Sequence, residues 1–415
     1  MRQVAVVGGG PAGMMAAIMA ARGGAHVTLI ERNEKLGKKL YITGKGRCNV
    51  TNTASGLEFL DNVARNAKFM MSSMAAFDSA SLVKFLGTLG LETKAERGGR
   101  VFPASDRASD VTRALARELE RLDVRIRLNA RVAEISVDRG DTSAFRGFVL
   151  EGGEVIAAEA GVIATGGASY PSTGSTGDGY RLLEAAGHTI IPVRPSLTSI
   201  ITREAWPARL AGLTLKNVTL TAVRGKRRVF HEMGELLLTH SGISGPLALS
   251  LSALLPDDYV GLGITIDLKP ALTEAVLEAR LLRELGAMPR SQLLAAVSKL
   301  CPRALALEVI SLAALSATMP CHQLTQQGRR ALLAVIKRVP LTIGALGGME
   351  EAVITRGGVS VREVNPSTME SKLIKGLYVA GELLDVDALT GGFNLQIAFS
   401  TGYAAGKSCV GAIGG

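Results

Sequence analysis

The sequence is poor in aromatic residues, in paired cysteines and in long apolar runs. Phe, Trp and Tyr make up 4% of the 415 residues, and Trp206 is the single tryptophan. The four cysteines (Cys48, Cys301, Cys321 and Cys409) lack the spacing of a disulfide framework or a zinc site, which predicts reduced thiols and no bound metal. No apolar run reaches the ~18 residues of a membrane-spanning helix. Because no secretory signal is visible either, we expect a cytoplasmic protein with no membrane partner.

Positive charge is in excess, and it is concentrated in the middle of the chain. The net charge is +10, and residues 191–340 contain 18 Lys and Arg against 10 Asp and Glu. The rest of the chain contains 29 against 27. The densest run is Arg224, Lys226, Arg227 and Arg228. Clustered cations attract phosphate backbones, so this region predicts either a polyanionic partner or simply a soluble basic surface.

The beginning of the chain follows the order strand, glycine turn, helix, strand. We expect strands at 4–7 and 26–30 and a helix of small residues at 12–22, which together form a βαβ unit. Such a unit belongs to a parallel, doubly wound sheet of the α/β class. Further buried strands are expected at 161–164 and 376–380, each followed by glycine, where open α/β sheets bind ligands.

The middle of the chain has a different pattern. Short alternating segments between 191 and 267 predict antiparallel strands and a small β-barrel, and a helical period follows from 273 to 339. The prediction is therefore a Rossmann-like domain interrupted by an insertion. Its parts are 1–190 and 346–415 for the nucleotide-binding domain, 191–270 for the barrel, and 271–345 for a helical subdomain, with the barrel closing near 340–350.

Gly8, Gly10 and Gly13 form a G-x-G-x-x-G fingerprint between a strand and a helix. Gly8 permits a tight turn, Gly10 lets the backbone approach a pyrophosphate, and Gly13 permits close packing of helix on strand. The helix N-terminus then offers unpaired N–H groups and a positive dipole to phosphates. Glu31, at the end of the second strand, is placed to accept hydrogen bonds from ribose hydroxyls and would repel a 2′-phosphate. These residues predict FAD or NAD(H).

A second glycine-rich half favours FAD. Ala164, Thr165 and Gly166 follow one strand, and Gly381 with Glu382 follows another, where a carboxylate suits the ribityl or pyrophosphate region of a flavin. Residues 391–396 (GGFNLQ) then begin a final helix, whose N–H groups are expected to stabilise negative charge at the N1/O2 edge of a reduced flavin.

Several longer motifs resemble a family of bacterial flavoproteins called BaiN/RdsA-like or YhiN-like. They are residues 37–40 (GKKL), 43–52 (TGKGRCNVTN), 164–180 (ATGGASYPSTGSTGDGY), 239–246 (THSGISGP), 357–359 (GGV), 368–371 (TMES) and 376–387 (GLYVAGELLDVD). The similarity extends over essentially the whole chain. It implies an FAD domain with a barrel and helical insertion, and an FAD-dependent reductase of activated C=C bonds. Two substrate classes go with the family: uridine in large-subunit (23S) ribosomal RNA, which becomes dihydrouridine, and unsaturated steroid-like bile-acid intermediates.

The predicted FAD contacts combine the fingerprint with the matching motif positions. They are Gly8, Gly10, Pro11, Ala12, Gly13, Glu31, Arg32, Lys39, Gly46, Arg47, Cys48, Ala164, Thr165, Gly166, Gly381, Glu382, Gly392, Phe393, Asn394 and Leu395. Residues 173–178 are expected to cradle a phosphate or to line the mouth of the site. Asp385 and Asp387 are expected to contact the flavin or to cap the final helix.

Reduction of a C=C bond needs a hydride, a proton donor and a group that holds the developing enolate. Cys48 is the predicted acid, because its cationic, glycine-flanked segment would lower the pKa of its thiol; the alternative is a small buried residue. Arg47 is expected to steady the enolate or to clamp a phosphate, and His240 is a further candidate acid or a structural residue. No second dinucleotide fingerprint is present, so NAD(P)H is expected only as a transient electron donor.

Three functions remain open from the sequence. The charge of the middle region favours reduction of uridine in ribosomal RNA, which is held mainly through its phosphates. The scarcity of aromatic residues for base stacking counts against RNA. The alternatives are a reductase of small-molecule enones, with an apolar pocket beside the flavin, and a flavin-bearing binding protein without turnover.

Overall fold

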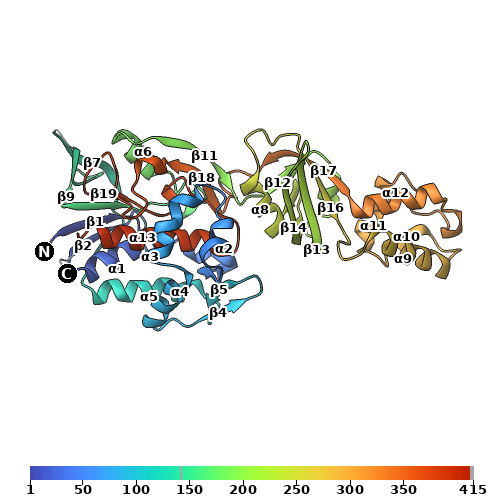
Figure 1. Cartoon of the computed structure of the whole chain (residues 1–415), viewed down its shortest axis with the longest axis horizontal. Helices are drawn as coiled ribbons and strands as arrows, with labels where there is room; N and C mark the ends of the chain where they lie inside the picture. Colours follow the sequence, from blue (N-terminus) through green and yellow to red (C-terminus); the bar gives the residue numbers. More distant parts are fainter. Residues whose placement is uncertain (141–142, 412–415) are drawn as a thin grey trace. The chain divides into compact units, whose positions relative to one another are not determined.

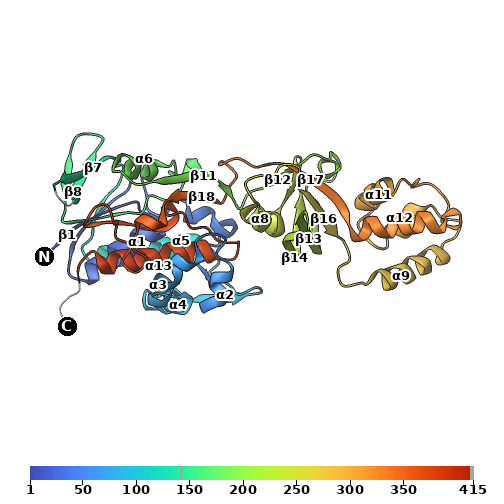
Figure 2. The same cartoon turned by 45° about the horizontal axis from the view of Figure 1, so that its top comes forward.

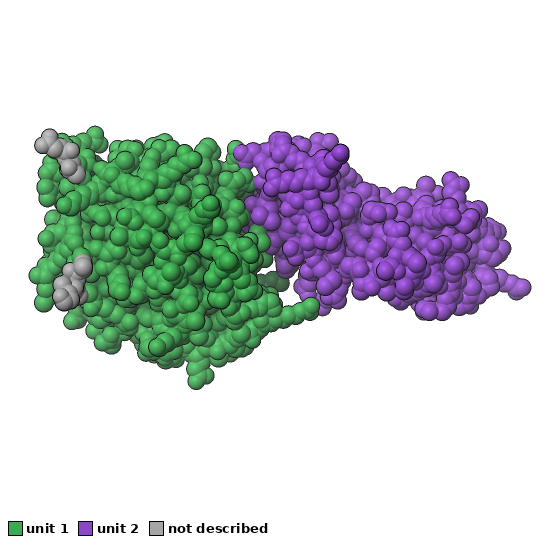
Figure 3. All heavy atoms as spheres, in the orientation of Figure 1, with its two compact units in different colours: residues 1–196, 348–415 green, residues 197–347 purple. Residues whose placement is uncertain are grey.

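The computed structural model describes residues 1–140 and 143–411. It divides into two compact units, residues 1–196 with 348–415 and residues 197–347, which Figure 3 colours separately. Each unit has its own cluster of buried apolar side chains. No described helix is both long and apolar enough to span a bilayer.

A five-stranded parallel sheet forms the centre of the first unit (Figure 1). Its strand order is β19-β10-β1-β2-β6. The bounds are β1 (Gln3–Val7), β2 (His26–Ile30), β6 (Arg125–Arg127), β10 (Ala160–Ile163) and β19 (Leu377–Val379). The expected strands at 4–7, 26–30, 161–164 and 376–380 are confirmed to within one residue, as is the doubly wound α/β class. Short, continuous apolar runs suit strands that are covered on both faces.

Two helices of small residues, α1 (Pro11–Arg22) and α13 (Phe393–Ser408), pack side by side in the first unit (Figures 1 and 2). A Cβ on Gly402 would lie 2.3 Å from the Ala12 carbonyl oxygen, and one on Gly406 would lie 2.3 Å from that of Ala16. Only glycine permits this backbone approach. The contact fixes the N-terminus of α13 relative to the fingerprint turn.

Smaller elements surround the central sheet of the first unit. Three antiparallel groups are β3 (Thr51–Asn52), β5 (Arg100–Pro103) and β4 (Thr93–Glu96); β7 (Val132–Arg139), β8 (Ser143–Leu150) and β9 (Val155–Ala157); and β11 (Ile190–Ser196) with β18 (Ile354–Val359). The helices are α2 (Gly56–Asp61), α3 (Met71–Ala76), α4 (Ser79–Thr88), α5 (Ala108–Arg121) and α6 (Asp178–Ala185).

The second unit contains a closed antiparallel barrel of six strands, as the sequence pattern predicts. In barrel order they are β12 (Ile200–Thr202), β15 (Gly242–Ser244), β14 (Arg227–Leu238), β13 (Thr214–Arg224), β16 (Gly263–Asp267) and β17 (Val339–Leu346). Two helices accompany the barrel, α7 (Trp206–Arg209) and α8 (Gly245–Leu254), and four lie between β16 and β17: α9 (Glu274–Ala287), α10 (Leu293–Val297), α11 (Arg303–Leu312) and α12 (Gln326–Lys337).

The ends of the second unit differ from the predicted insertion by a few residues. The alternation at 191–196 predicts part of the barrel, but this segment is β11, which pairs with β18. Sequence alternation does not identify a strand's partner, because the whole second unit separates β11 from β18 along the chain. The helices and the barrel strands also share one apolar core.

Candidate functional site

The fingerprint turn joins β1 to α1 and is closed by backbone contacts. Gly8 has a φ of +106°, and a Cβ there would lie 2.3 Å from the Ala164 oxygen. A Cβ on Gly13 would lie 1.8 Å from the Gly8 oxygen, whereas one on Gly10 would meet nothing within 4 Å. Gly10 is the N-cap of α1 and Pro11 follows it, so the helix N-terminus has no capping side chain. The turn therefore offers open space and N–H groups, which suits a pyrophosphate.

Glu31 lies buried at the end of β2 and is fixed by backbone donors. Its carboxylate accepts hydrogen bonds from Gly9 N at 2.6 Å and from Asn33 N at 2.7 Å. The neighbouring Arg32 pairs with Asp178 at 2.9 Å, at the start of α6. Asn33 Nδ2 donates to the Thr173 oxygen, so the loop at 173–178 lies against the end of β2. A carboxylate held in this way is oriented for ribose hydroxyls.

Lys39 and Glu382 form a largely buried ion pair at the end of β19. Lys39 Nζ lies 2.9 Å from Glu382 Oε2 and donates to Ser169 Oγ at 2.7 Å. Glu382 Oε1 also accepts from Ser169 Oγ and from Thr355 N. Gly381 is equally constrained, because its N–H donates to Thr401 Oγ1 on α13. The Glu382 carboxylate is thus held rigidly by groups from separate segments of the chain.

Residues 44–52 lie against the N-terminus of α13. Gly392, the N-cap of α13, has a φ of +102°, and a Cβ there would lie 2.2 Å from the Thr51 oxygen. Asn52 Nδ2 donates to the Gly391 oxygen at 2.9 Å. The Asn49 Oδ1 atom is buried beside Gly392 and has no partner among the described residues. An orphaned acceptor beside a helix N-terminus is a polar environment that suits the amide edge of a flavin ring.

The backbone of this segment is strained. Gly44, Lys45, Gly46 and Cys48 all have positive φ, between 57° and 86°. Such conformations cost about 1–3 kcal/mol each for residues other than glycine, and they concentrate at functional sites. The strain and the orphaned Asn49 oxygen thus occur in the same segment.

The expected activation of Cys48 is wrong. Its thiol is fully buried, and burial raises the pKa to about 12, against which a hydrogen bond with Thr43 is the smaller influence. The neighbouring Arg47 is engaged elsewhere: it is bound by Glu96 and Asp106, and its guanidinium lies 4.1 Å from the centre of the Phe102 ring. At neutral pH Cys48 is therefore a neutral thiol, and Arg47 is part of a surface ion-pair network.

The other predicted residues are divided between the two units. Ala164, Thr165 and Gly166 follow β10, and Thr165 Oγ1 is buried without a partner among the described residues. Ala12, Phe393, Asn394 and Leu395 lie in the first turns of α1 and α13, and Gly46 lies in the strained segment. His240 belongs to the second unit, where it is exposed just after β14. The roles given to these residues stay predictions.

Asp385 and Asp387 lie between β19 and α13 and do not cap the helix, whose N-cap is Gly392. Asp387 is fully buried, and its Oδ2 accepts a hydrogen bond from Ser196 Oγ at 2.9 Å. Burial raises the pKa of Asp387 to about 6, and burial likewise raises the pKa of Asp385. The neighbouring Arg65, which no sequence motif singled out, lies 3.9 Å from Asp387 Oδ1.

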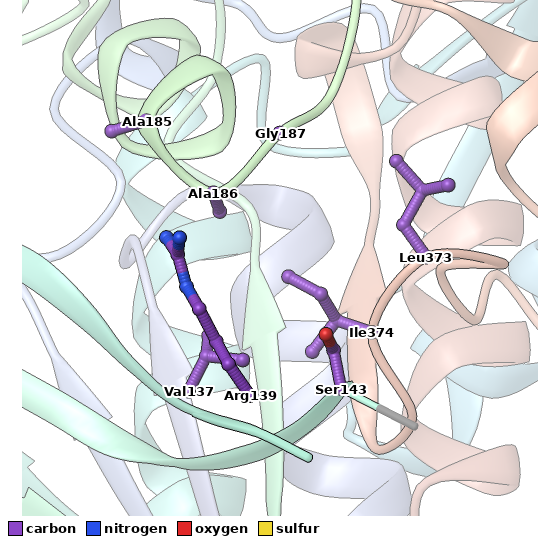
Figure 4. A pocket seen from close by; sticks show the side chains of 8 residues that line it. All are labelled: Val137, Arg139, Ser143, Ala185, Ala186, Gly187, Leu373 and Ile374. Atoms are coloured by element: carbon purple, nitrogen blue, oxygen red, sulfur yellow. The ribbon is translucent and has the colours of Figure 1, made fainter. Parts of the chain in front are cut away.

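A surface pocket of the first unit lies elsewhere. It is formed by the β7–β8 hairpin, the end of α6 and residues 373–374 (Figure 4). Arg139 is the charged residue in its lining, and none of the eight lining residues is a predicted site residue. The pocket is therefore distinct from the glycine-rich site described above.

The chain matches, over residues 2–408, the family model described as HI0933-like protein Rossmann domain. The chain belongs to this family. The resemblance found from the sequence motifs is thereby confirmed. Together with its relatives, this membership makes the protein an FAD-dependent reductase that acts on C=C bonds.

Two relatives are similar over nearly their whole lengths. The 3-dehydro-bile acid delta(4,6)-reductase of Clostridium scindens is 32% identical over 414 residues, which are 98% of this chain and 99% of the relative. The ribosomal RNA dihydrouridine synthase of Escherichia coli is 29% identical over 412 residues, 98% of each. The names of these two relatives indicate two different substrates, a bile acid and ribosomal RNA.

Among solved structures, the chain is similar to the 3-ketosteroid-delta4-(5alpha)-dehydrogenase from Rhodococcus jostii in complex with 4-androstene-3,17-dione. The TM-score is 0.51 at 16% identity, with 99% of this chain and 97% of that chain covered. At this identity the likeness supports the fold alone, a Rossmann domain with an inserted barrel.

Proposed function

We propose that the protein reduces a uridine of large-subunit ribosomal RNA to dihydrouridine. The observation that carries this proposal is the turn between β13 and β14. Lys226, Arg227 and Arg228 are exposed there, and none has an ion-pair partner among the described residues. Only Arg224 of this run is neutralised, by Asp258. Unpaired cations at the end of a long hairpin form a contact surface for a phosphate backbone.

Other cations of the second unit differ from those of the hairpin turn. Several of its other cations have acidic partners: Arg209 with Glu308, Arg329 with Glu278, Lys337 with Asp267 and Arg338 with Glu274. Exposed cations that serve only solubility need not be gathered in one turn. The hairpin turn is therefore the part of the excess charge that favours an RNA partner.

The proposed FAD site is the glycine-rich edge of the first unit. The α1 N-terminus would hold the pyrophosphate, Glu31 the adenosine ribose, and the Lys39–Glu382 pair would lie by the ribityl chain. The flavin ring would lie by Asn49 and the α13 N-terminus, whose dipole favours negative charge at N1/O2. When bound and reduced, FAD supplies a hydride from N5. We infer that NAD(P)H acts only as a transient reductant of the flavin.

A gene deletion tests the proposed function. Dihydrouridine in the large-subunit ribosomal RNA of the source organism would be mapped by mass spectrometry with and without the gene. The proposal predicts that one dihydrouridine disappears and returns when the gene is supplied on a plasmid. An unchanged map would contradict it.

A second candidate is the reduction of a small-molecule enone. It is favoured by the 32% identity to the bile-acid reductase, which extends over 98% of the chain. Under this alternative the cations of the hairpin turn have no role in catalysis. Replacing them would then leave turnover of every substrate unchanged, and the ribosomal RNA map would not depend on the gene.

A further inference from the structure

Arg65 is a partly buried guanidinium whose hydrogen-bonding capacity is unused. About a third of its side chain is exposed, and that side chain forms no hydrogen bond with a described residue. Its Nε is buried and lies 3.9 Å from Asp387 Oδ1, which is within charge attraction but beyond hydrogen-bond length. A guanidinium has five N–H donors, and a buried donor without an acceptor costs free energy. The arrangement would be completed by an acceptor from a ligand.

Asp387 is held more firmly than Arg65. Ser196 Oγ donates to Asp387 Oδ2 at 2.9 Å, and the Oδ1 atom has no hydrogen-bond partner among the described residues. The backbone oxygen of Asp387 accepts from Ala64 N at 2.8 Å and from Arg65 N at 3.3 Å. Backbone and side chain of Arg65 therefore both face a fixed residue. Other charges that act on Asp387 are those of Asp385 and Glu382.

The segment that carries Arg65 is joined to the first turn of α13. Leu389 N donates to the Asn62 oxygen, and Val63 pairs with Ala388 in a β-bridge. Asn394, on the first turn of α13, exchanges hydrogen bonds with the backbone of Ala388. Phe59 and Phe393 meet edge to face, with ring centres 5.2 Å apart. The segment that carries Arg65 is thus connected to the helix N-terminus at which the flavin ring is proposed.

We propose that Arg65 is a catalytic residue that donates hydrogen bonds to the carbonyl oxygen conjugated with the substrate's C=C bond. Asp387 and Ser196 are positioning residues that hold its guanidinium. When the hydride adds to the β-carbon, the π electrons of the C=C bond move toward this oxygen as an enolate. Charge-assisted hydrogen bonds from Arg65 then strengthen. Protonation of the α-carbon, with the proton taken ultimately from water, restores the carbonyl group.

This inference rests on the proposed position of the flavin, and it is independent of the choice between RNA and a small molecule. Uracil has a carbonyl conjugated with its 5,6 double bond, and an enone has the same arrangement. Both substrate classes present one oxygen that gains negative charge during the reduction. The proposed role of Arg65 concerns only this carbonyl oxygen and does not depend on the rest of either substrate.

The test is a single-turnover measurement on FAD-loaded protein. The flavin is reduced anaerobically with dithionite and mixed with 2-cyclohexen-1-one or with an unmodified ribosomal RNA transcript, and its reoxidation is followed by absorbance. We expect Arg65→Met to lower the limiting rate per bound flavin about 100-fold and Arg65→Lys about tenfold, because lysine keeps the charge without the planar fork. Arg117→Met, an exposed arginine on α5, is the matched control and should change nothing.

Asp387→Asn separates positioning from stability. In the wild type, the rate should fall as pH is lowered through about 6, where Asp387 gains a proton and loses its attraction for Arg65. The Asn variant should be slower and lack this acid limb. The inference would be overturned if Arg65→Met oxidised its flavin at the wild-type rate per bound flavin with both probes. If Arg65→Met fails to bind FAD, the Asp387→Asn variant decides instead. The inference would then be overturned if the rate of Asp387→Asn still fell below pH 6 as it does in the wild type. If the enone but not the RNA oxidises wild-type flavin, the RNA function fails while the role of Arg65 is still decided.

Discussion

The two units use their characteristic residues in opposite ways. In the first unit, glycines such as Gly13, Gly402 and Gly406 bring backbone against backbone, at positions where a Cβ would lie within 2.3 Å of a carbonyl oxygen. In the second unit, the turn at 224–228 places exposed cations in solvent. The cofactor half therefore depends on shape, whereas the proposed RNA surface depends on charge. Substitutions in the two regions should consequently fail in different ways.

The largest effect is expected at the α1–α13 contact. Gly402→Ala should destabilise the protein by about 3 kcal/mol or more and reduce its FAD content, because the new Cβ meets the Ala12 oxygen at 2.3 Å. The matched control is Gly87→Ala on α4, where a Cβ meets nothing and helix propensity predicts a gain of about 0.5–1 kcal/mol. Chemical unfolding and flavin absorbance measure both variants. Equal effects of the two substitutions would refute the steric account.

Substitutions in the hairpin turn should change only the affinity of the protein for RNA. Replacing Lys226, Arg227 and Arg228 by serine should weaken binding of a ribosomal RNA fragment about tenfold to 100-fold and reduce the slope of log K against log salt by about 2–3. FAD content and oxidation of the reduced flavin by 2-cyclohexen-1-one should remain those of the wild type.

A triple variant of Lys84, Arg113 and Arg117, exposed cations on α4 and α5 of the first unit, provides the charge-matched control. It should retain the affinity for RNA. If both triple variants lose affinity to the same extent, the attraction is a property of the net charge and not of the hairpin.

Asp387 predicts a pH dependence of stability. Its pKa of about 6 lies above the ~3.9 of an unfolded chain, so the folded state binds the proton more tightly. The carboxyl group therefore destabilises the fold increasingly as pH rises from about 4 to about 6, by up to about 3 kcal/mol. Asp387→Asn should gain this amount relative to the wild type between pH 4 and pH 7 in urea titrations. A constant difference across that range would show that the carboxyl group is not buried as described.

The smallest effect is expected at the cysteines. Burial raises the pKa of Cys48 and Cys409 to about 12 and that of Cys301 to about 11, and it also raises the pKa of Cys321. All four are free thiols. Native protein should therefore show no fast-reacting thiol toward Ellman's reagent at pH 8, and the denatured chain should show four. Rapid labelling of Cys48 in the native state would restore it as a candidate acid.

The sequence pattern predicted the fold because the relevant signals are local. Apolar runs followed by glycine located β1, β10 and β19, and the alternating period between 191 and 267, before the helical period from 273, indicated the barrel. The pairing of β11 with β18 was not predicted, because two strands separated by the whole inserted unit leave no local signal in the sequence. Periodicity shows which face of a strand is buried, but it does not show which element covers that face or which strand pairs with it.

The glycine positions of the proposed site could be predicted from the sequence because the backbone geometry requires them. Gly8, Gly13 and Gly392 are required by close approaches that glycine alone permits, so their spacing carries information. The environment of a side chain was harder to predict, because it depends on residues that are distant in the sequence. The neighbouring cations suggested a lowered pKa for the Cys48 thiol, whereas burial raises that pKa. Arg65 was missed because its partner Asp387 lies near the other end of the chain.

The central claim is that reduced flavin in the first unit passes its hydride to a uracil that the basic hairpin of the second unit helps to bind. The most direct measurement is anaerobic reoxidation of the reduced protein by an unmodified ribosomal RNA transcript, with dihydrouridine quantified in the product. The account predicts one dihydrouridine per flavin oxidised in the wild type, with a much higher RNA concentration for half-maximal rate in the hairpin triple variant. Reoxidation by 2-cyclohexen-1-one without any by the RNA would contradict it.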